Sequence, residues 1–374
     1  MAIKKVLYIF GTRPEAIKMA PLILMMKQST AFEVKVCVTG QHRTMLDQVL
    51  QFFHITPDYD LDLMKPNQTL ATITGDAIKG ISSILSEECD PDFVIVQGDT
   101  TTALAGAVGG FYFKKKVVHI EAGLRSNNKF SPFPEEMNRV LITRLADLHF
   151  APTQQAHDNL IREGVDPGSV FNVGNTVIDA LFLGLENLKT NGHADIGNKF
   201  PYLTNGKRVL LVTGHRRENF GMPFENICYA LKEIVERNDD VQIIYPVHLN
   251  PNVVEPVRRI LGNSDRIHLT EPLDYPYLIW LLDRSYLVVT DSGGIQEEAP
   301  ALGKPVIVMR DVTERMEGVT AGTAVLVGTD RERIFDKCQQ LLTDPAEYRK
   351  MARSVNPYGD GDSCRRITSI LQTQ

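Results

Sequence analysis

The feature that most constrains the fold is a regular alternation of short apolar runs with longer helix-like segments along the whole chain. Short buried strands that alternate with helices are typical of parallel sheets with helices on both faces. The expected strands are residues 6–10, 34–38, 93–96, 117–120, 209–212, 242–245, 286–289 and 306–308, and the expected helices include 16–27, 42–53, 70–88 and 364–371. The pattern therefore predicts doubly wound α/β domains.

The length of 374 residues is too great for one compact core and predicts two domains of ordinary size. The connecting region is residues 174–206, which contains a polar, Gly-containing stretch, and the alternation restarts at Lys207. We expect one domain over residues 1–172 and a second over 173–356. The carboxyl ends of their strands should face a cleft, where α/β sheets bind ligands.

The composition narrows the function. The net charge of −6 and the lack of a basic stripe argue against nucleic-acid binding. No apolar run reaches the length of a membrane span. The five cysteines are scattered, which favours reduced thiols in a cytoplasmic enzyme. The sequence lacks G-x-x-x-x-G-K-[ST], G-x-G-x-x-G, H-E-x-x-H and G-x-S-x-G, so it supports neither a P-loop, a dinucleotide cofactor, a metal site nor a hydrolase elbow.

The stretch TDSGGIQEEAPALGKP, residues 290–305, has the properties of an anion site. An apolar run ends, Ser292, Gly293 and Gly294 follow, and a helical segment begins. A helix start offers unpaired N–H groups and partial positive charge, and glycines let a phosphate approach the backbone. Phosphate alone does not explain Glu297 and Glu298, but a ribose hydroxyl could use one of them. The stretch therefore predicts a nucleotide site.

Three carboxylates are candidates for acid/base chemistry. Asp99 and Glu121 follow two successive strands, and close carboxylates push one pKa upward. Each has a structural alternative: Asp99 as a helix cap, Glu121 in a salt bridge to Arg125, and Glu135 as an acid at a helix start. These alternatives stay open on spacing alone.

Cations follow other strands. Arg13 and Lys18 begin a helix after the first strand, where an anion nearby would explain them, although solvated surface charge is the alternative. His215 lies between Gly214 and two arginines after residues 209–212 and is a candidate for anion binding or acid/base work. Arg310 and Arg315 follow residues 306–308 and could meet phosphates at the Ser292 loop.

Nine motifs in order resemble the non-hydrolysing UDP-N-acetylglucosamine 2-epimerases of bacteria: GTRPEAIK, TGQHR, GDTTT, HIEAGLR, PFPEEMNR, TGHRREN, YPVHLNP, DSGGIQEEAP and NPYGDG. The resemblance covers nearly the whole chain. It implies a GT-B type fold of two Rossmann-like domains around a central cleft, with a C-terminal helix that crosses back, so that residues 357–374 join the first domain. It also implies a homodimer and reversible conversion of UDP-GlcNAc to UDP-ManNAc, which supplies ManNAc-derived sugars for surface polysaccharides.

The resemblance also implies a route and its residues. UDP is eliminated from C1 with loss of the C2 proton, 2-acetamidoglucal forms, and UDP adds back with a proton on the other face, without a cofactor or metal. Asp99, Glu121 and Glu135 would transfer protons or stabilise the oxocarbenium-like centre, and His215 would assist at the phosphate. Which carboxylate is the base stays open. The residues expected to bind the UDP-sugar are Arg13, Lys18, Asp99, Glu121, His215, Tyr277, Ser292, Gly293, Gly294, Glu298 and Arg315.

Some members of this family bind a second, activating UDP-GlcNAc. Residues that match that region are Gln41, His42, Arg216 and His248, whereas Asn67 stands where such members carry an arginine, which weighs against activation. Three alternatives to the non-hydrolysing epimerase stay open: a hydrolysing epimerase that releases ManNAc, a UDP-sugar glycosyltransferase of the same architecture, and a nucleotide-sugar sensor without catalysis.

Overall fold

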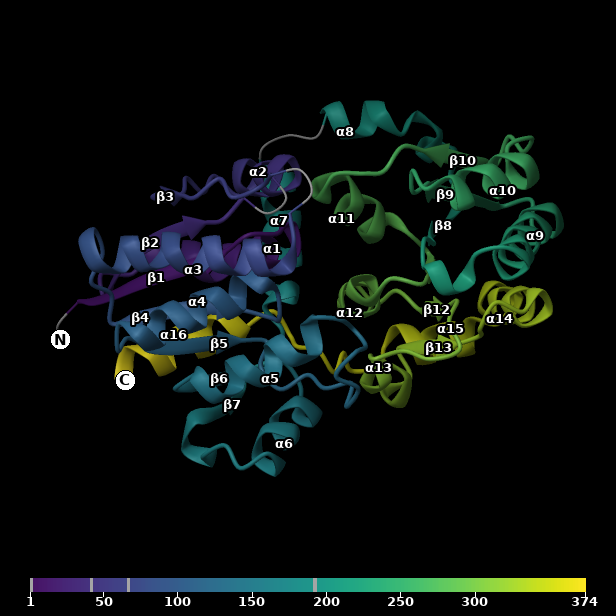
Figure 1. Ribbon diagram of the computed structural model, residues 1–374. Coiled ribbons are helices and arrows are strands. Elements are labelled where there is room, and N and C mark those ends of the chain that lie inside the picture. The colour runs from purple at the N-terminus through teal and green to yellow at the C-terminus, as the bar shows by residue number, and fades with distance from the viewer. Residues whose placement is uncertain (1–2, 41–42, 66–67, 191–193) are drawn as a thin grey trace. The chain divides into compact units, whose positions relative to one another are not determined.

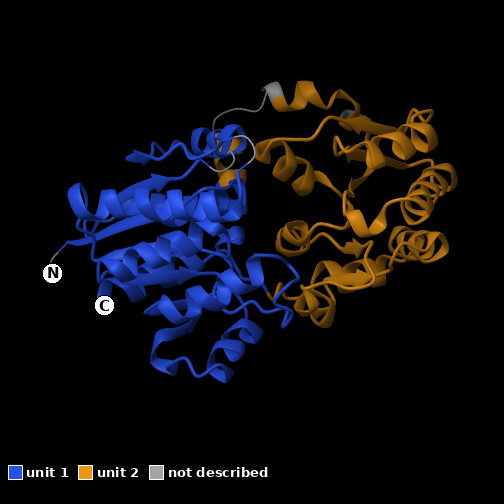
Figure 2. Cartoon of the chain, in the orientation of Figure 1, with its two compact units in different colours: residues 1–183, 358–374 blue, residues 184–357 orange. Residues whose placement is uncertain are grey.

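The structure is a computed structural model that describes residues 3–40, 43–65, 68–190 and 194–374 (Figure 1). The chain divides into two compact units, shown in different colours in Figure 2. Unit 1 comprises Met1–Leu183 and Tyr358–Gln374, and unit 2 comprises Gly184–Pro357. The first crossing between the units therefore lies within helix α7 (Thr176–Thr190), after the expected division at residue 172.

Unit 1 is a parallel sheet covered by helices on both faces (Figure 1). The strand order is β3-β2-β1-β4-β5-β6-β7, so the order reverses between β1 and β4. The strands are β1 (Lys4–Phe10), β2 (Phe32–Val38), β3 (Tyr59–Asp60), β4 (Phe93–Gln97), β5 (Lys116–Ile120), β6 (Leu148–Ala151) and β7 (Val170–Asn172). The helices are α1 (Arg13–Gln28), α2 (Arg43–Phe52), α3 (Leu70–Glu87), α4 (Thr101–Tyr112), α5 (Glu135–Leu145), α6 (Gln154–Arg162), the first part of α7, and α16 (Ser363–Thr373).

Unit 2 repeats the scheme with the strand order β10-β9-β8-β11-β12-β13, which reverses between β8 and β11. Its strands are β8 (Arg208–Thr213), β9 (Val241–Pro246), β10 (Ile267–Thr270), β11 (Leu287–Thr290), β12 (Val306–Val308) and β13 (Ala324–Leu326). Its helices are α8 (Ala194–Lys199), α9 (Met222–Arg237), α10 (Pro251–Leu261), α11 (Tyr275–Arg284), α12 (Gly293–Ala301), α13 (Met316–Ala321), α14 (Arg331–Thr343) and α15 (Pro345–Ala352). Ligands of open α/β sheets bind at such reversal points.

The expected strands are all present, and the structure adds β3, β6, β7, β10 and β13. Four of the five, β3, β6, β7 and β10, carry a polar residue that interrupts the apolar run by which a buried strand is recognised, and β13 is apolar but spans only three residues. The prediction of two Rossmann-like α/β units is confirmed. Among the described residues, no helix is both long and apolar enough to cross a membrane.

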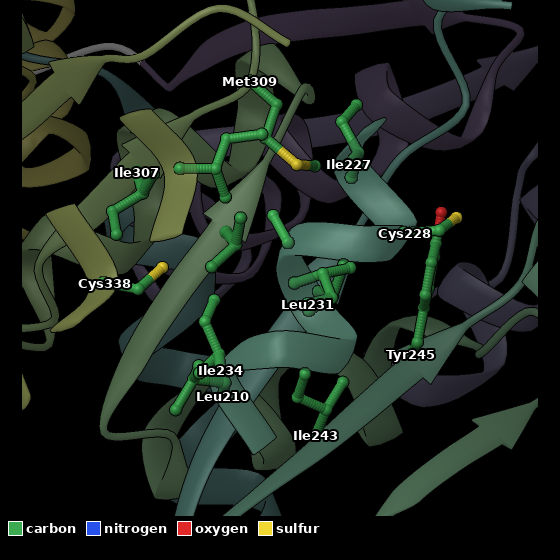
Figure 3. Close-up of a cluster of buried hydrophobic side chains, with 14 of the residues drawn as sticks. Leu210, Ile227, Cys228, Leu231, Ile234, Ile243, Tyr245, Ile307, Met309 and Cys338 are labelled. Carbon is green, nitrogen blue, oxygen red and sulfur yellow. The ribbon is translucent and has the colours of Figure 1, made fainter. Parts of the chain in front are cut away.

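The buried side chains in the core of unit 2 support the loop that follows β8 (Figure 3). Helix α9 buries Ile227, Leu231 and Ile234, which recur at the spacing of one helical face. Each such side chain contributes about 1.5–3 kcal/mol when fully buried. Tyr245 of β9 packs in the same cluster, and its hydroxyl donates to the carbonyl of Gly214 at 3.0 Å. The core thereby anchors the loop that follows β8.

The C-terminal helix α16 belongs to unit 1, as expected for a helix that crosses back. It packs on α1 and buries Cys364, Ile367 and Leu371 along one face. The backbone N–H of Cys364 donates to Asp179 Oδ1 at 2.8 Å, which ties the start of α16 to α7. The chain therefore leaves unit 1 after α7 begins and returns to it at Tyr358.

Candidate functional site

Glu121 lies at the end of β5 and is the most heavily bonded of the predicted acids. Its Oε1 accepts from Lys18 Nζ at 2.6 Å and from Asn175 Nδ2 at 3.1 Å, and its Oε2 accepts from Gln97 Nε2. Only 7% of the side chain is exposed. Its φ of +61° lies in the left-handed region, which costs a non-glycine residue about 1–3 kcal/mol and is found most often at functional sites.

This geometry corrects the expected alternative that Glu121 forms a salt bridge with Arg125. Arg125 pairs with Glu163, with Nε 2.7 Å from Oε1, and also donates to Thr143. The carboxylate of Glu121 is instead held by Lys18, which lies 103 positions earlier in the chain. Lys18 is thus engaged with a carboxylate of the sheet edge and is not a solvated surface cation.

Asp99 follows β4, which pairs with β5 in parallel, so it lies at the strand end next to Glu121. Arg139 Nη2 lies 2.6 Å from Asp99 Oδ2, and Asn138 Nδ2 donates to its carbonyl at 2.9 Å. Burial raises the pKa of Asp99, Arg139 opposes that rise, and the charge of Glu121 adds to it. The helix-cap alternative is wrong, because Thr100 caps α4 by accepting from Ala103 N–H.

A buried carboxylate, Glu15, joins the loops that follow β1 and β4. Its Oε2 accepts from the backbone N–H groups of Gly11 and Thr12 at 3.0 and 2.8 Å, and its Oε1 accepts from Thr100 Oγ1 at 2.6 Å. Burial raises the pKa of Glu15, and these hydrogen bonds oppose the rise. Arg13 is the first residue of α1, is half-buried, and makes no ion pair with any described residue.

The two acids in the first turn of α5 have different surroundings. Glu136 is buried and accepts from the N–H groups of Ser126 and Asn127 at 2.9 and 3.0 Å, so it stabilises the loop before the helix. Glu135 is the first residue of α5, as its structural alternative required, and it is half-buried. Its charge nevertheless raises the pKa of Asp99, so the structure brings Glu135 into the neighbourhood of that acid.

In unit 2, His215 lies at the reversal point between β8 and β11, beside a fully buried carboxylate, Asp291. The N–H groups of His215 and Arg216 both donate to Asp291 Oδ2 at 2.8 Å, and His215 Nδ1 lies 3.3 Å from Oδ1. Burial raises the pKa of Asp291, but the His215 and Arg216 hydrogen bonds outweigh it and hold that pKa below its usual range. The arrangement fixes the imidazole, of which 42% stays exposed.

The Ser292 loop is the N-terminus of α12. Ser292 is the N-cap residue, and its side chain makes no capping hydrogen bond. Gly293 and Gly294 are the first residues of the helix and have no left-handed φ, so their glycine character leaves room beside the backbone N–H groups. A Cβ on Gly293 would lie 3.5 Å from Arg315 Cζ. The loop thus joins free N–H groups with a guanidinium, as an anion site requires.

Arg315 is held in place by Glu297, the carboxylate that the nucleotide hypothesis left without a role. Arg315 Nε donates to Glu297 Oε1 at 2.8 Å, and Glu297 is buried. Arg310 pairs with two carboxylates, and its expected contact with phosphate stays a prediction. Its Nε donates to Glu218 at 2.8 Å and its Nη1 to Glu314 at 3.0 Å, so it stabilises the loop after β12.

Glu298 and Tyr277 lie on two helices of unit 2, α12 and α11. Glu298 is buried beside Tyr275, whose pKa is raised by burial and further by the Glu298 carboxylate. Tyr277 lies in the first turn of α11, with Lys199 Nζ 3.8 Å from its ring centroid and the Phe200 ring at 6.3 Å. Tyr277 therefore belongs to an aromatic cluster, and its role in substrate binding stays a prediction.

The candidate second nucleotide-sugar site is described only in part. Gln41, His42 and Asn67 lie outside the described residues. The rings of His215 and His248 stack with centroids 5.5 Å apart, and Arg216 Nε donates to the Asp291 carbonyl at 3.3 Å. Burial and the charge of His215 lower the pKa of His248. Both Arg216 and His248 thus lie around His215.

Sequence reasoning missed the residues that hold the predicted ones. They are Gln97, Arg139, Asn175 and Asp291, and for Glu297 it missed the role of holding Arg315. Asp291 and Gln97 do stand directly at strand ends, so the rule that found Asp99 could have included them. Among the described residues, no three His, Cys, Asp or Glu side chains converge where a metal ion could be held.

The protein belongs to the GT-B class of two-unit α/β folds. Three features define this class here: a strand-order reversal in each sheet, a helix N-terminus suited to bind an anion, and a C-terminal helix that returns to unit 1. The family model for UDP-N-acetylglucosamine 2-epimerase matches residues 25–372. The chain belongs to the UDP-N-acetylglucosamine 2-epimerase family.

Individual relatives agree with this assignment. The UDP-N-acetylglucosamine 2-epimerase of Salmonella typhimurium is 53% identical over 371 residues, which cover 99% of this chain and 98% of that protein. That of Bacillus subtilis is 52% identical, covering 98% and 94%. The crystal structure of the Neisseria meningitidis UDP-GlcNAc 2-epimerase bound to UDP-GlcNAc superimposes with a TM-score of 0.90 at 47% identity, covering 99% of this chain and all of that one.

Proposed function

We propose that this protein interconverts UDP-GlcNAc and UDP-ManNAc without hydrolysis, by eliminating UDP and adding it back. One observation carries the proposal: Asp99 and Glu121 end neighbouring parallel strands at the edge of unit 1 and have unlike surroundings. Glu121 accepts from three donors, which favour its ionised form, whereas burial raises the pKa of Asp99. Two carboxylates with unlike environments are suited to opposite proton-transfer roles.

The chemistry requires one proton acceptor and one proton donor at C2. In the first step the C2–H bond breaks, its electrons form the C1=C2 bond, and UDP leaves with the electrons of the C1–O bond. In the second step a UDP oxygen adds to C1 and a proton is delivered to the opposite face of C2. Atoms and electrons balance without an oxidant. Asp99, Glu121 and Glu135 are the groups proposed for the proton transfers and for stabilising the positive charge at C1.

Unit 2 would bind the leaving group. The N-terminus of α12 offers free N–H groups and partial positive charge to a diphosphate, and Arg315 lies beside Gly293. His215, held by Asp291, is proposed to assist at the phosphate as charge develops. Removing one donor at developing charge costs on the order of 3 kcal/mol in turnover. Glu298 is proposed to bind the ribose, and Arg13 and Lys18 to contribute positive charge from unit 1.

The decisive experiment incubates the protein with UDP-GlcNAc in deuterated water, with no acceptor and no cofactor, and follows the sugars by NMR. We expect deuterium at C2 and a mixture of the two UDP-sugars. Retention of the original C2 hydrogen in the product would contradict the elimination route. Free ManNAc as the main product would instead assign the protein to the hydrolysing epimerases.

A further inference from the structure

We propose that Asn175 is a positioning residue that holds the Glu121 carboxylate, an inference that rests on the proposed function. Asn175 lies between β7 and α7 and is buried, with 3% of the residue exposed. Its Nδ2 donates to Glu121 Oε1 at 3.1 Å, across 54 positions of sequence. Asparagine side chains at such positions commonly cap a helix, and this one also donates to a carboxylate.

The orientation of the Asn175 amide is fixed by its other bonds. Its Oδ1 accepts from Val177 N–H at 3.1 Å at the start of α7. The oxygen is therefore occupied by the helix, and the amide must present its N–H₂ group to the carboxylate. A buried donor that points at a carboxylate oxygen fixes one lone-pair direction of that carboxylate and favours its ionised form.

The backbone of Asn175 is tied down as well. Its N–H donates to the Tyr358 carbonyl at 2.7 Å, where the chain re-enters unit 1. The preceding residue, Gly174, has a φ of +91°, and a Cβ there would lie 2.6 Å from Ser363 Oγ and 3.3 Å from Gly359 Cα. Only glycine allows this close approach. Asn175 thus links Glu121 to the two segments at which the chain leaves and rejoins the unit.

The contact complements the other two donors on Glu121. Lys18 approaches the same oxygen from α1, and Gln97 approaches Oε2 from β4. Three donors on three different elements hold the carboxylate in one rotamer, at a residue whose backbone is itself strained. Removal of Asn175 takes a short, buried amide donor away from Oε1 and leaves Lys18, whose four-carbon side chain fixes direction less well.

Two substitutions separate positioning from helix capping. Asn175→Ser keeps a good N-cap oxygen for α7 but removes the donor to Glu121. Asn175→Asp also keeps the cap and places a like charge beside Glu121. Asn172→Asp is the matched control, because it makes the same substitution at the same strand end on an exposed residue whose Nδ2 donates to Gln154 Oε1 at 3.2 Å.

The readouts are kcat, KM and the pH–rate profile for UDP-GlcNAc epimerisation, with thermal unfolding measured alongside. We expect Asn175→Ser to melt near the wild-type temperature and to lose roughly tenfold to a hundredfold in kcat, since a hydrogen bond to a charged group is lost, with KM little changed. Asn175→Asp should lose more and shift the acid limb of the profile to higher pH. Asn172→Asp should match the wild type.

Three results would overturn the assignment: wild-type kcat and pH profile in Asn175→Ser, equal loss in Asn172→Asp, or a loss that follows the melting temperature alone. If Asn175→Asp does not fold, the serine variant still decides. The wild-type arm separates this inference from the function on which it rests. A wild-type protein that does not interconvert the UDP-sugars refutes the proposed function, whereas active variants beside an active wild type refute only the role of Asn175.

Discussion

The carboxyl edges of the two sheets have the same strand arrangement but carry different side chains. In unit 1 the candidate residues follow β1, β4 and β5, and in unit 2 they follow β8, β11 and β12, so both sets include the strands on either side of the reversal point. The edge of unit 1 carries acids that are linked to one another by charge, chiefly Asp99 and Glu121. The edge of unit 2 carries an imidazole, a guanidinium and a helix N-terminus. Asp291 holds the imidazole of His215, and Glu297 holds the guanidinium of Arg315.

The difference teaches that the same fold can serve proton transfer at one edge and anion binding at the other. In unit 1 the cations Lys18 and Arg139 hold the acids, and the acids are the chemical groups. In unit 2 the acids Asp291 and Glu297 hold the cationic groups. A substitution among the acids of the first edge should therefore affect turnover, and one that releases Arg315 at the second edge should affect the affinity for UDP.

The largest effect is expected for Glu121→Gln. The amide keeps the shape of the side chain and can still accept from Lys18, so the fold should survive, but it cannot take or give a proton in the same way. Because acid/base groups contribute a factor on the order of 10² to 10⁴, kcat for UDP-GlcNAc should fall by that amount. The dissociation constant of UDP, measured by calorimetry, should stay near the wild-type value.

The control for this substitution is Glu163→Gln, which neutralises a carboxylate of the same unit that pairs with Arg125 at 2.7 Å. It should leave turnover intact. Wild-type turnover in Glu121→Gln would reassign Glu121 to a structural ion pair with Lys18. Weakened UDP binding in the same variant would instead contradict the assignment of UDP affinity to the edge of unit 2 alone.

How far the sequence predicts this arrangement depends on the range of the interactions. Asp99, Glu121, His215 and Ser292 were predicted because an apolar run marks each strand and its end can be read locally. Their partners could not be predicted, since contacts such as the one between Lys18 and Glu121 exist only once distant segments fold together. The alternative of a local salt bridge to Arg125 was wrong for the same reason, because Arg125 pairs with a residue 38 positions later.

Two buried histidines make the stability of unit 1 depend on pH. His119 and His149 face each other in register on β5 and β6 and are buried, and burial lowers their pKa values to about 3 and about 4. Unfolded histidine titrates near pH 6.5, so the folded unit 1 binds fewer protons than the unfolded chain below that pH. The stability that these neutral histidines provide is complete above about pH 6.5 and is lost as the pH falls toward their folded pKa values.

At pH 5.5 each of these two buried histidines should lower the free energy of unfolding of unit 1 by about 1.4 kcal/mol relative to neutral pH. Burial also lowers the pKa values of His248 and His268 in unit 2, but both keep contact with solvent, so their effect should be smaller. Burial raises the pKa values of Glu15 and Asp99, so protonation of these two acids favours the folded state and acts against the loss from the histidines. Acid should therefore loosen unit 1 first.

Hydrogen exchange read by mass spectrometry tests this order. Between pH 7 and 5.5, after correction for intrinsic exchange rates, peptides from β5 and β6 should lose protection before those from β8 and β11. The only tryptophan, Trp280, lies in unit 2, so its fluorescence should stay native while unit 1 loosens. Earlier loss of protection in unit 2 would contradict the structural role of the buried pair.

The smallest effect is expected for Glu297→Gln at the edge of unit 2. The amide keeps the volume of this buried side chain but loses the charge that holds Arg315 Nε at 2.8 Å. Arg315 then loses its fixed position beside Gly293, and the dissociation constant of UDP should rise about tenfold, which corresponds to about 1.4 kcal/mol. Because the acids of unit 1 are untouched, kcat at saturating UDP-GlcNAc should stay near the wild-type value.

Glu314→Gln is the matched control for that substitution, because Glu314 pairs with Arg310 at 3.0 Å in the loop just before Arg315. Calorimetry should find wild-type UDP affinity in this variant. Equal weakening in both variants would mean that the loop responds to any lost ion pair, and wild-type affinity in Glu297→Gln would remove Arg315 from the phosphate site. A fall in kcat without a change in affinity would transfer Glu297 to the catalytic side of the comparison, since only groups needed in the transition state alter kcat alone.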